Sequence, residues 1–260
     1  MTLKQKLEYH YKAFDKSRIS PDPLQFLHLY KDEKDIEIAG FISSVFAYGN
    51  VKQIINTLEK IFKATEGNPY QFVLNFNENK EGKNLKGIKH RFYTEGDLIL
   101  LFSAINLVLN EHVTLKNLFL NYYSPKDKNI KNALSGFSYY FIESVKLLTG
   151  RKYVGRGIKF MFPLPELGSA CKRMNLFLRW MVRKDELDFG LWKEIPADKL
   201  IIPVDTHVAR ICKSLRLTER KIIGWKMAEE ITENLKKYDP VDPVKYDFAI
   251  CHIGMRKIIF

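Results

Sequence analysis

Apolar residues recur at helical spacing along most of the chain. Between positions 51 and 63, for example, intervals of three and four residues join Val51, Ile54, Ile55, Leu58, Ile61 and Phe62, as in an amphipathic helix. The same spacing, broken by glycine- and proline-containing segments, predicts helices over 36–48, 51–63, 70–76, 98–109 and 130–148. The polar, glycine-containing stretch 77–89 is expected to be an exposed loop.

Convincing strand patterns are missing from the sequence. The one short β-like run, Leu200–Val204, contains Pro203, which cannot donate to a strand ladder. We therefore expect an all-α fold. A chain of 260 residues has room for one large domain or two small ones.

The charge balance bears on the partner. The chain has 42 Lys and Arg against 30 Asp and Glu, a formal net charge of +12. An excess of this size favours a polyanionic partner, either nucleic acid or an anionic membrane surface. A lysine-rich proteome would give the same excess without such a partner, so the charge alone does not decide between these interpretations.

Other classes of protein are disfavoured. The sequence has no run of 18 apolar residues, and its first residues lack the apolar core of a signal peptide. Cys171, Cys212 and Cys251 are too far apart for a disulfide framework or a Cys-x-x-Cys metal site. We therefore expect a cytoplasmic protein that does not associate with membranes.

A basic segment precedes a tight turn near the middle of the chain. The stretch 146–165 has no acidic residue and interleaves Lys146, Arg151, Lys152, Arg156 and Lys159 with Tyr153, Phe160 and Phe162. The turn Leu164-Pro-Glu-Leu-Gly-Ser169 and a helical pattern follow. Backbone N–H groups at such a turn suit a DNA phosphate, and the charge continues in Arg173, Arg179 and Arg183, which we expect to face the duplex. The alternative is an ordinary corner between two helices.

A second motif surrounds Asp205. This residue stands directly before a helical stripe of Val208, Ile211, Cys212 and Leu215, where an aspartate can cap the first turn. Capping alone would explain an aspartate at this position.

Together these motifs resemble the helix-hairpin-helix DNA glycosylase superfamily. Pro203-Val-Asp-Thr-His-Val-Ala-Arg-Ile-Cys-Lys-Ser-Leu215 is similar to the signature that carries the superfamily's catalytic Asp, and Leu164-Pro-Glu-Leu-Gly168 is similar to its DNA-gripping hairpin, usually Leu-Pro-Gly-x-Gly. The segment Tyr246–Gly254 resembles the helix that follows the Asp domain, and Ser43-Ser44 stands where the loop facing the minor groove would begin. The resemblance covers roughly residues 35–258.

The position of the candidate lysine indicates a branch of this superfamily. Lys172 precedes Asp205 by 33 residues, a longer separation than in endonuclease III-type enzymes, and the segment Cys171–Arg183 looks like the archaeal 8-oxoguanine glycosylase branch and an uncharacterised bacterial group related to it. Two features depart from the superfamily pattern: Glu166 replaces the first hairpin glycine, and Lys172 lies four residues after Gly168 rather than two. Because only Cys251 lies near the C-terminus, we expect no iron–sulfur cluster.

The resemblance assigns roles to these residues. A neutral Lys172 amine would attack the sugar C1′ and form a Schiff base, and we expect burial, the helix N-terminus and Arg173 to lower its pKa. Asp205 would relay the proton and stabilise positive charge on the sugar, and His207 could support it. The DNA-binding candidates are Arg156, Lys159, Pro165, Leu167, Gly168 and Ser169. A flipped base needs an apolar or aromatic pocket, which Phe46, Tyr48, Trp180, Trp192 or Trp225 could line, although each could equally belong to the core.

The resulting hypothesis is a bifunctional DNA glycosylase with AP-lyase activity. It would remove an oxidised purine such as 8-oxoguanine from damaged double-stranded DNA, as a monomer without metal or cofactor, associated with the nucleoid. The expected architecture has a helical barrel over 35–185 and a second helical subdomain from 1–34 and 186–260, with the active site in the cleft between them. The alternatives are a non-catalytic helical DNA-binding protein and a basic helical adaptor for RNA or protein partners.

Overall fold

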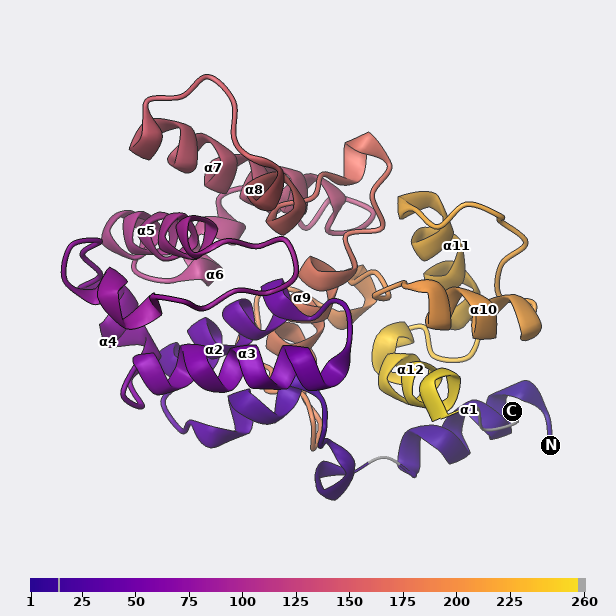
Figure 1. Ribbon diagram of the computed structural model, residues 1–260. Helices are drawn as coiled ribbons and strands as arrows, with labels where there is room; N and C mark the ends of the chain where they lie inside the picture. Colours follow the sequence, from indigo (N-terminus) through magenta and orange to yellow (C-terminus); the bar gives the residue numbers. More distant parts are fainter. Residues whose placement is uncertain (14, 257–260) are drawn as a thin grey trace. The chain divides into compact units, whose positions relative to one another are not determined.

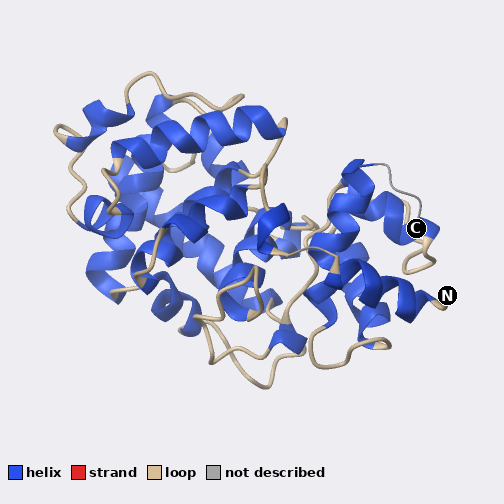
Figure 2. Cartoon of the chain, turned by 90° about the horizontal axis from the view of Figure 1, so that it is seen from below, coloured by secondary structure: helices blue, strands red, loops and turns tan. Residues whose placement is uncertain are grey.

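The computed structural model describes residues 1–13 and 15–256 and consists of helices joined by loops (Figure 1). The α-helices are α1 (Leu3–Lys12), α2 (Glu33–Phe46), α3 (Val51–Ala64), α4 (Pro69–Leu74), α5 (Glu95–His112), α6 (Leu115–Leu120), α7 (Lys131–Thr149), α8 (Arg156–Met161), α9 (Lys172–Val182), α10 (Thr206–Ser214), α11 (Trp225–Lys236) and α12 (Asp247–Arg256). Short 3₁₀ helices are η1 (Lys16–Arg18), η2 (Pro23–Leu29), η3 (Glu81–Leu85), η4 (Pro165–Leu167), η5 (Ala197–Lys199) and η6 (Pro243–Tyr246). Within the described residues no β-strand forms (Figure 2), which confirms the all-α class.

The predicted helices are all present with small shifts at their ends. Helices α2, α3, α4, α5 and α7 correspond to the five predicted ranges, and Leu200–Val204 forms no strand. The stretch 77–89 departs from the expectation of an exposed loop, because it contains η3 and buries Leu85. None of the described helices combines the length and the apolar character needed to cross a membrane.

The chain divides into two compact units. Unit 1 consists of Met1–Ser20, Pro125–Lys131 and Leu164–Phe260, and unit 2 consists of Pro21–Ser124 and Asn132–Pro163. These boundaries differ from the expected division at 34/35 and 185/186. As a result, the turn after Leu164 and helix α9 lie in the same unit as the Asp205 motif.

Unit 2 is organised around the apolar helix α2. This helix packs against η2 and α4, and α4 in turn packs against α5. Phe41 on α2 lies in an aromatic cluster with Phe137, Phe141 and Phe162. The expectation for Ser43 and Ser44 is wrong: both are buried inside α2, where the helix continues to Phe46, so no loop begins there.

Unit 1 gathers helices from both ends of the described chain. Helices α1 and α10 both pack against α12, and α11 packs against η6. The rings of Phe177 on α9 and Trp192 meet edge to face in its core. This packing fixes the starting points of α9 and α10, from which the candidate site is built.

Candidate functional site

The turn before α9 is a well-defined local structure. Pro165–Leu167 form η4, which ends at Gly168 in the left-handed conformation at a φ of 85°. The carbonyl of Gly168 accepts a hydrogen bond from the backbone N–H of Trp225, and a Cβ on Gly224 would lie only 2.6 Å from that same carbonyl oxygen. Glycine at position 224 therefore allows α11 to begin directly against the turn. Leu167 projects from the turn and is 79% exposed.

Helix α9 begins without a side-chain cap. Its N-cap residue, Cys171, has a left-handed backbone with a φ of 48°, and no side-chain capping hydrogen bond forms there. The left-handed region is costly for a residue with a side chain. Ser169 accepts the Cys171 N–H, and the Asn175 side chain donates to the carbonyl of Ala170. These contacts secure the segment that leads into Lys172.

Asp205 has the capping position that its sequence predicts. It is the N-cap of α10, and its Oδ1 accepts from the backbone N–H groups of His207 and Val208. Its other carboxylate oxygen, Oδ2, remains directed at a different partner. The aspartate can therefore cap the helix and take part in chemistry at the same time.

That second partner is Lys172. The distance from Lys172 Nζ to Asp205 Oδ2 is 3.1 Å, and the two side chains are 29% and 25% exposed. The helix starts thus bring together two residues that are 33 positions apart in the sequence. Both side chains are partly exposed, so a ligand could contact them.

The electrostatics of the pair contradict the expected pKa of the lysine. Burial is the largest single influence and lowers the pKa of Lys172, but the attraction and hydrogen bond of Asp205, together with Cys251 and Asp247, raise this pKa above its ordinary value. Burial alone would raise the pKa of Asp205. Lys172 and the backbone N–H groups of Val208 and His207 together lower it by more, so the pKa falls below its ordinary value. At neutral pH the pair is an ammonium and a carboxylate.

A third ionisable residue, Asp247, interacts electrostatically with the pair. Asp247, the first residue of α12, is buried and accepts a hydrogen bond from Arg179 through Oδ2. Burial, opposed by Arg179 and Lys172 and reinforced by Asp205, raises the pKa of Asp247 to about 6. Its Oδ1 is buried and has no hydrogen-bond partner among the described residues. Asp247 is not among the site residues expected from the sequence, and the one signal for it is its place in the Tyr246–Gly254 motif.

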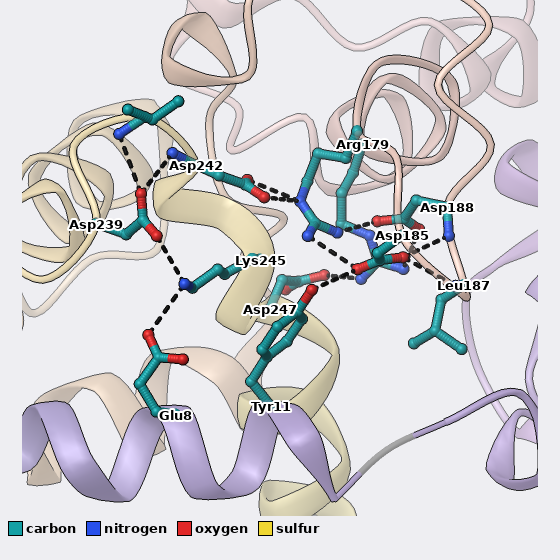
Figure 3. A network of polar contacts seen from close by, with 12 residues as sticks. Glu8, Tyr11, Arg179, Asp185, Leu187, Asp188, Asp239, Asp242, Lys245 and Asp247 are labelled. Atoms are coloured by element: carbon teal, nitrogen blue, oxygen red, sulfur yellow. Dashed lines mark hydrogen bonds and ion pairs between the residues drawn. The ribbon is translucent and has the colours of Figure 1, made fainter.

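The arginines of α9 do not face a DNA duplex. Arg179 pairs with Asp188 and Asp247, which Figure 3 labels. Arg183 pairs with Asp185, Asp188 and Asp242. Both guanidinium groups are only 3% exposed. Arg173 is buried as well. The expectation that these three arginines bind phosphates is therefore wrong, because their charge is directed into the interior of unit 1.

Other predicted site residues lie apart from the Lys172–Asp205 pair. The contribution of His207 to Asp205 is its backbone N–H, while the residue itself is exposed. Arg156 and Lys159 are exposed on α8 in unit 2. Of the base-pocket candidates, Phe46 is buried and Tyr48 partly buried in unit 2, whereas Trp180, Trp192 and Trp225 are buried in unit 1. Burial of Phe46 and the three tryptophans favours the alternative that they belong to the cores.

The arrangement has a definite chemical capacity. An amine and a carboxylate in contact can exchange a proton, and the amine can then attack an electrophilic carbon. The exposed turn at Leu167–Ser169 lies just before the lysine in the chain and can contact a large ligand.

Comparisons with known proteins add the family but no activity. No curated protein and no solved structure matches the chain. A family model described as "Protein of unknown function (DUF2400)" matches residues 22–256, which include the turn, Lys172, Asp205 and Asp247. The chain belongs to the DUF2400 family.

Proposed function

We propose that this protein is a DNA glycosylase with AP-lyase activity that removes an oxidised purine, foremost 8-oxoguanine, from double-stranded DNA. The observation that carries the proposal is the contact between Lys172 and Asp205, 3.1 Å from Nζ to Oδ2, at the starts of two helices. The resemblance of both motifs to helix-hairpin-helix glycosylases supplies the reaction class. The pair needs no metal ion for this chemistry.

The reaction would use the two residues in sequence. After its proton passes to Asp205, the Lys172 amine attacks C1′ of the sugar; the glycosidic bond breaks, and its electron pair leaves with the base, which takes up a proton. As the C1′–O4′ bond breaks, its electron pair stays on O4′, which takes up a proton released by the attached nitrogen, and a protonated imine remains between Nζ and C1′. Loss of a proton from C2′ then expels the 3′ phosphate by β-elimination, and water hydrolyses the imine to restore the lysine.

Because the pKa of Lys172 is raised, substrate binding must promote loss of the lysine proton before the amine can attack. The resting lysine is charged because Asp205 holds its proton in place. A sugar that carries developing positive charge would repel the ammonium and lower the pKa of Lys172, which favours release of its proton. Asp205 would act in two stages: it accepts this proton, and once it has passed the proton to the leaving base, its carboxylate stabilises positive charge on the sugar.

Borohydride trapping tests the proposal directly. Borohydride reduces the imine to a stable amine, which leaves the protein covalently attached to DNA. We expect the wild-type protein to form this adduct with a duplex containing 8-oxoguanine, with uracil, alkylated-base and abasic duplexes defining the substrate range. Lys172→Ala should form none, and Asp205→Asn should form it more slowly.

A matched control is available on α11. Lys226 is exposed in the first turn of that helix, so Lys226→Ala removes a lysine from a comparable position and should leave trapping unchanged. Trapping by Lys172→Ala would contradict the assignment of the lysine. If no duplex is trapped by the wild-type protein, the lyase proposal is wrong.

A non-catalytic DNA-binding protein is the second candidate. The observation in its favour is the raised pKa of Lys172, because a stably charged lysine can simply bridge α9 and α10. This candidate predicts duplex binding without trapping. Failure to bind duplex DNA even at low salt would instead favour an adaptor for RNA or protein partners.

A further inference from the structure

A polar hollow lies in unit 2, whereas the residues of the proposed reaction belong to unit 1. Its volume is about 420 Å³, within the range of small-ligand sites. One wall is a face of α3, and the other is the segment just before Tyr93; the lining residues are Gln53, Asn56, Thr57, Lys89, His90 and Arg91. The lining has two basic side chains, a histidine and neutral hydrogen-bonding groups, and it has no carboxylate. We call this hollow the Lys89–Arg91 pocket.

Arg91 is held in position at considerable conformational cost. Its backbone is left-handed with a φ of 55°, inside a tight turn closed by hydrogen bonds between His90 and Tyr93. Its guanidinium lies 5.4 Å from the centre of the Tyr48 ring. A Cβ at Gly49 would lie 2.9 Å from Arg91 Cδ, so the arginine side chain packs closely on that turn, and a larger residue at position 49 would make it shift. Strained residues of this kind persist where the surroundings hold them, often at ligand sites.

His90 lines the pocket, and contacts at both ring nitrogens hold its side chain in place. The ring is buried, with Nε2 3.0 Å from the carbonyl oxygen of Tyr48 and Nδ1 3.1 Å from the hydroxyl of Thr57. Because a carbonyl only accepts, Nε2 carries a hydrogen. The Thr57 hydroxyl also lies 2.8 Å from the carbonyl of Gln53 and has a single hydrogen to donate.

This hydrogen bonding couples the pocket to the charge of His90. When the ring is neutral, the Thr57 hydrogen can satisfy either His90 Nδ1 or the Gln53 carbonyl. When the ring is protonated, Nδ1 donates to Thr57, and Thr57 donates to Gln53, so all three contacts are satisfied. Lys89 and Arg91 on the same segment oppose the imidazolium; Tyr48, Thr57 and Tyr93 bring no charge at neutral pH. A bound anion would favour the protonated form of the His90 ring.

We propose that the Lys89–Arg91 pocket binds a phosphate group. Lysine, arginine and side-chain amides are the groups that bind phosphate oxygens, and arginine is favoured where two oxygens are held at once. The phosphate comes from one of two sources, a small phosphate compound or the backbone of a nucleic acid. The site is independent of Lys172 and Asp205, and it stands whether or not the protein is a glycosylase.

The test measures the stabilisation of the protein by inorganic phosphate. Thermal unfolding is followed with increasing phosphate against sodium chloride at equal ionic strength. We expect phosphate to raise Tm in the wild-type protein. The double variant Lys89→Gln/Arg91→Gln should bind phosphate about tenfold or more weakly and lose most of this rise.

Two further variants make the result specific. Asn56→Asp places a carboxylate at an exposed position of the pocket wall and should also abolish the phosphate response. The control Lys60→Gln/Lys63→Gln removes the same charge from exposed positions of α3 outside the pocket and should respond like the wild type. An equal response to phosphate in all four proteins would overturn the proposal.

Nitrogen chemical shifts of the His90 ring give a second readout. Phosphate should move both ring nitrogens toward the values of an imidazolium at constant pH. If phosphate raises Tm but leaves the His90 shifts unchanged, the anion binds elsewhere and the proposed site is wrong.

A duplex-binding arm separates the two sources. Binding of an unmodified duplex is measured over a range of salt concentrations for both double variants. A larger loss for Lys89→Gln/Arg91→Gln than for Lys60→Gln/Lys63→Gln identifies a backbone phosphate. If both double variants lose duplex binding equally, while only Lys89→Gln/Arg91→Gln loses the phosphate response, the ligand is a small phosphate compound. Borohydride trapping enters neither measurement, so this proposal and the proposed glycosylase can fail separately.

Discussion

Helix α9 carries two charged clusters with opposite character. At its start, Lys172 has one ion-pair partner, Asp205, and both side chains are about a quarter exposed. Arg179, two turns later (Figure 3), and Arg183, the residue that directly follows the helix, are buried among four aspartates. The same helix thus presents one pair to solvent and seals the other groups inside unit 1.

The difference distinguishes the proposed reactive site from a structural cluster. A buried ion pair is worth little relative to apolar packing, but removal of one partner is expensive because the other charge is left unpaired. An exposed pair contributes little to stability and remains accessible to ligands. Substitutions in the arginine cluster should therefore act on stability, whereas substitutions of Lys172 should act on chemistry.

The largest effect is expected at Arg183. Arg183→Met leaves Asp185, Asp188 and Asp242 without their shared cation, which should destabilise the fold by about 3–5 kcal/mol. Urea unfolding at neutral pH measures the change. Arg151→Met, at an exposed position just after α7, should change stability by no more than about 0.5 kcal/mol. Comparable effects of the two substitutions would remove the distinction between the clusters.

The next effect is a pH dependence at Asp247. Burial raises the pKa of this carboxyl to about 6 in the folded protein, against about 3.9 in an unfolded chain. Between these values the folded state holds a proton that the unfolded state has lost, so stability falls as pH rises, by roughly 3 kcal/mol at most for this group.

Asp247→Asn isolates that contribution. The asparagine cannot titrate, so the stability of the wild type relative to the variant should fall between about pH 4 and pH 7 by up to roughly 3 kcal/mol. Urea unfolding of both proteins across this range measures the difference. Parallel pH profiles would show that Asp247 does not hold its proton in the folded state.

A smaller effect separates the two roles of Asp205. Asp205→Ala removes the cap on α10 and should cost about 1 kcal/mol, whereas Asp205→Asn keeps a capping oxygen and should cost less. Both substitutions remove the carboxylate and should slow trapping. Chemical denaturation and trapping rates compare them; equal loss of stability would mean that the cap contributes nothing.

The smallest effect on stability is expected at Lys172. Lys172→Met removes a partly exposed pair and leaves Asp205 with two backbone donors, so the loss should be within about 1 kcal/mol. Trapping should nevertheless disappear. A loss of several kcal/mol in urea unfolding would place Lys172 with the structural cluster and favour the non-catalytic candidate.

Local sequence signals were sufficient where the responsible interactions are local. The spacing of apolar residues predicted α2, α3, α5 and α7 with small errors at their ends, because a helix closes its hydrogen bonds within four residues. The N-cap role of Asp205 could be predicted for the same reason, since the cap bonds join residues only two and three positions apart. The buried η3 was missed, because its burial depends on packing against α5 rather than on its own polar composition.

Charge was the property that sequence order described least well. Arg179 and Arg183 follow a basic segment and suggested a DNA-facing surface, yet their partners come from residues 185–188, 242 and 247. The direction of the Lys172 pKa shift was missed in the same way, since it depends on an aspartate 33 residues away. Local sequence gives the sign of each charge but does not give the residues with which that charge interacts.

The sequence by itself determined the all-α class, the helix positions, the cap at Asp205 and the chemical identity of Lys172 and Asp205. Tertiary structure alone decided that these two residues touch, that three neighbouring arginines are turned inward, and that Lys89 and Arg91 share a hollow with a face of α3. The physical reason is range. Helical hydrogen bonds and caps act over a few residues, whereas burial and Coulomb interactions depend on distances in space that only the packed chain sets.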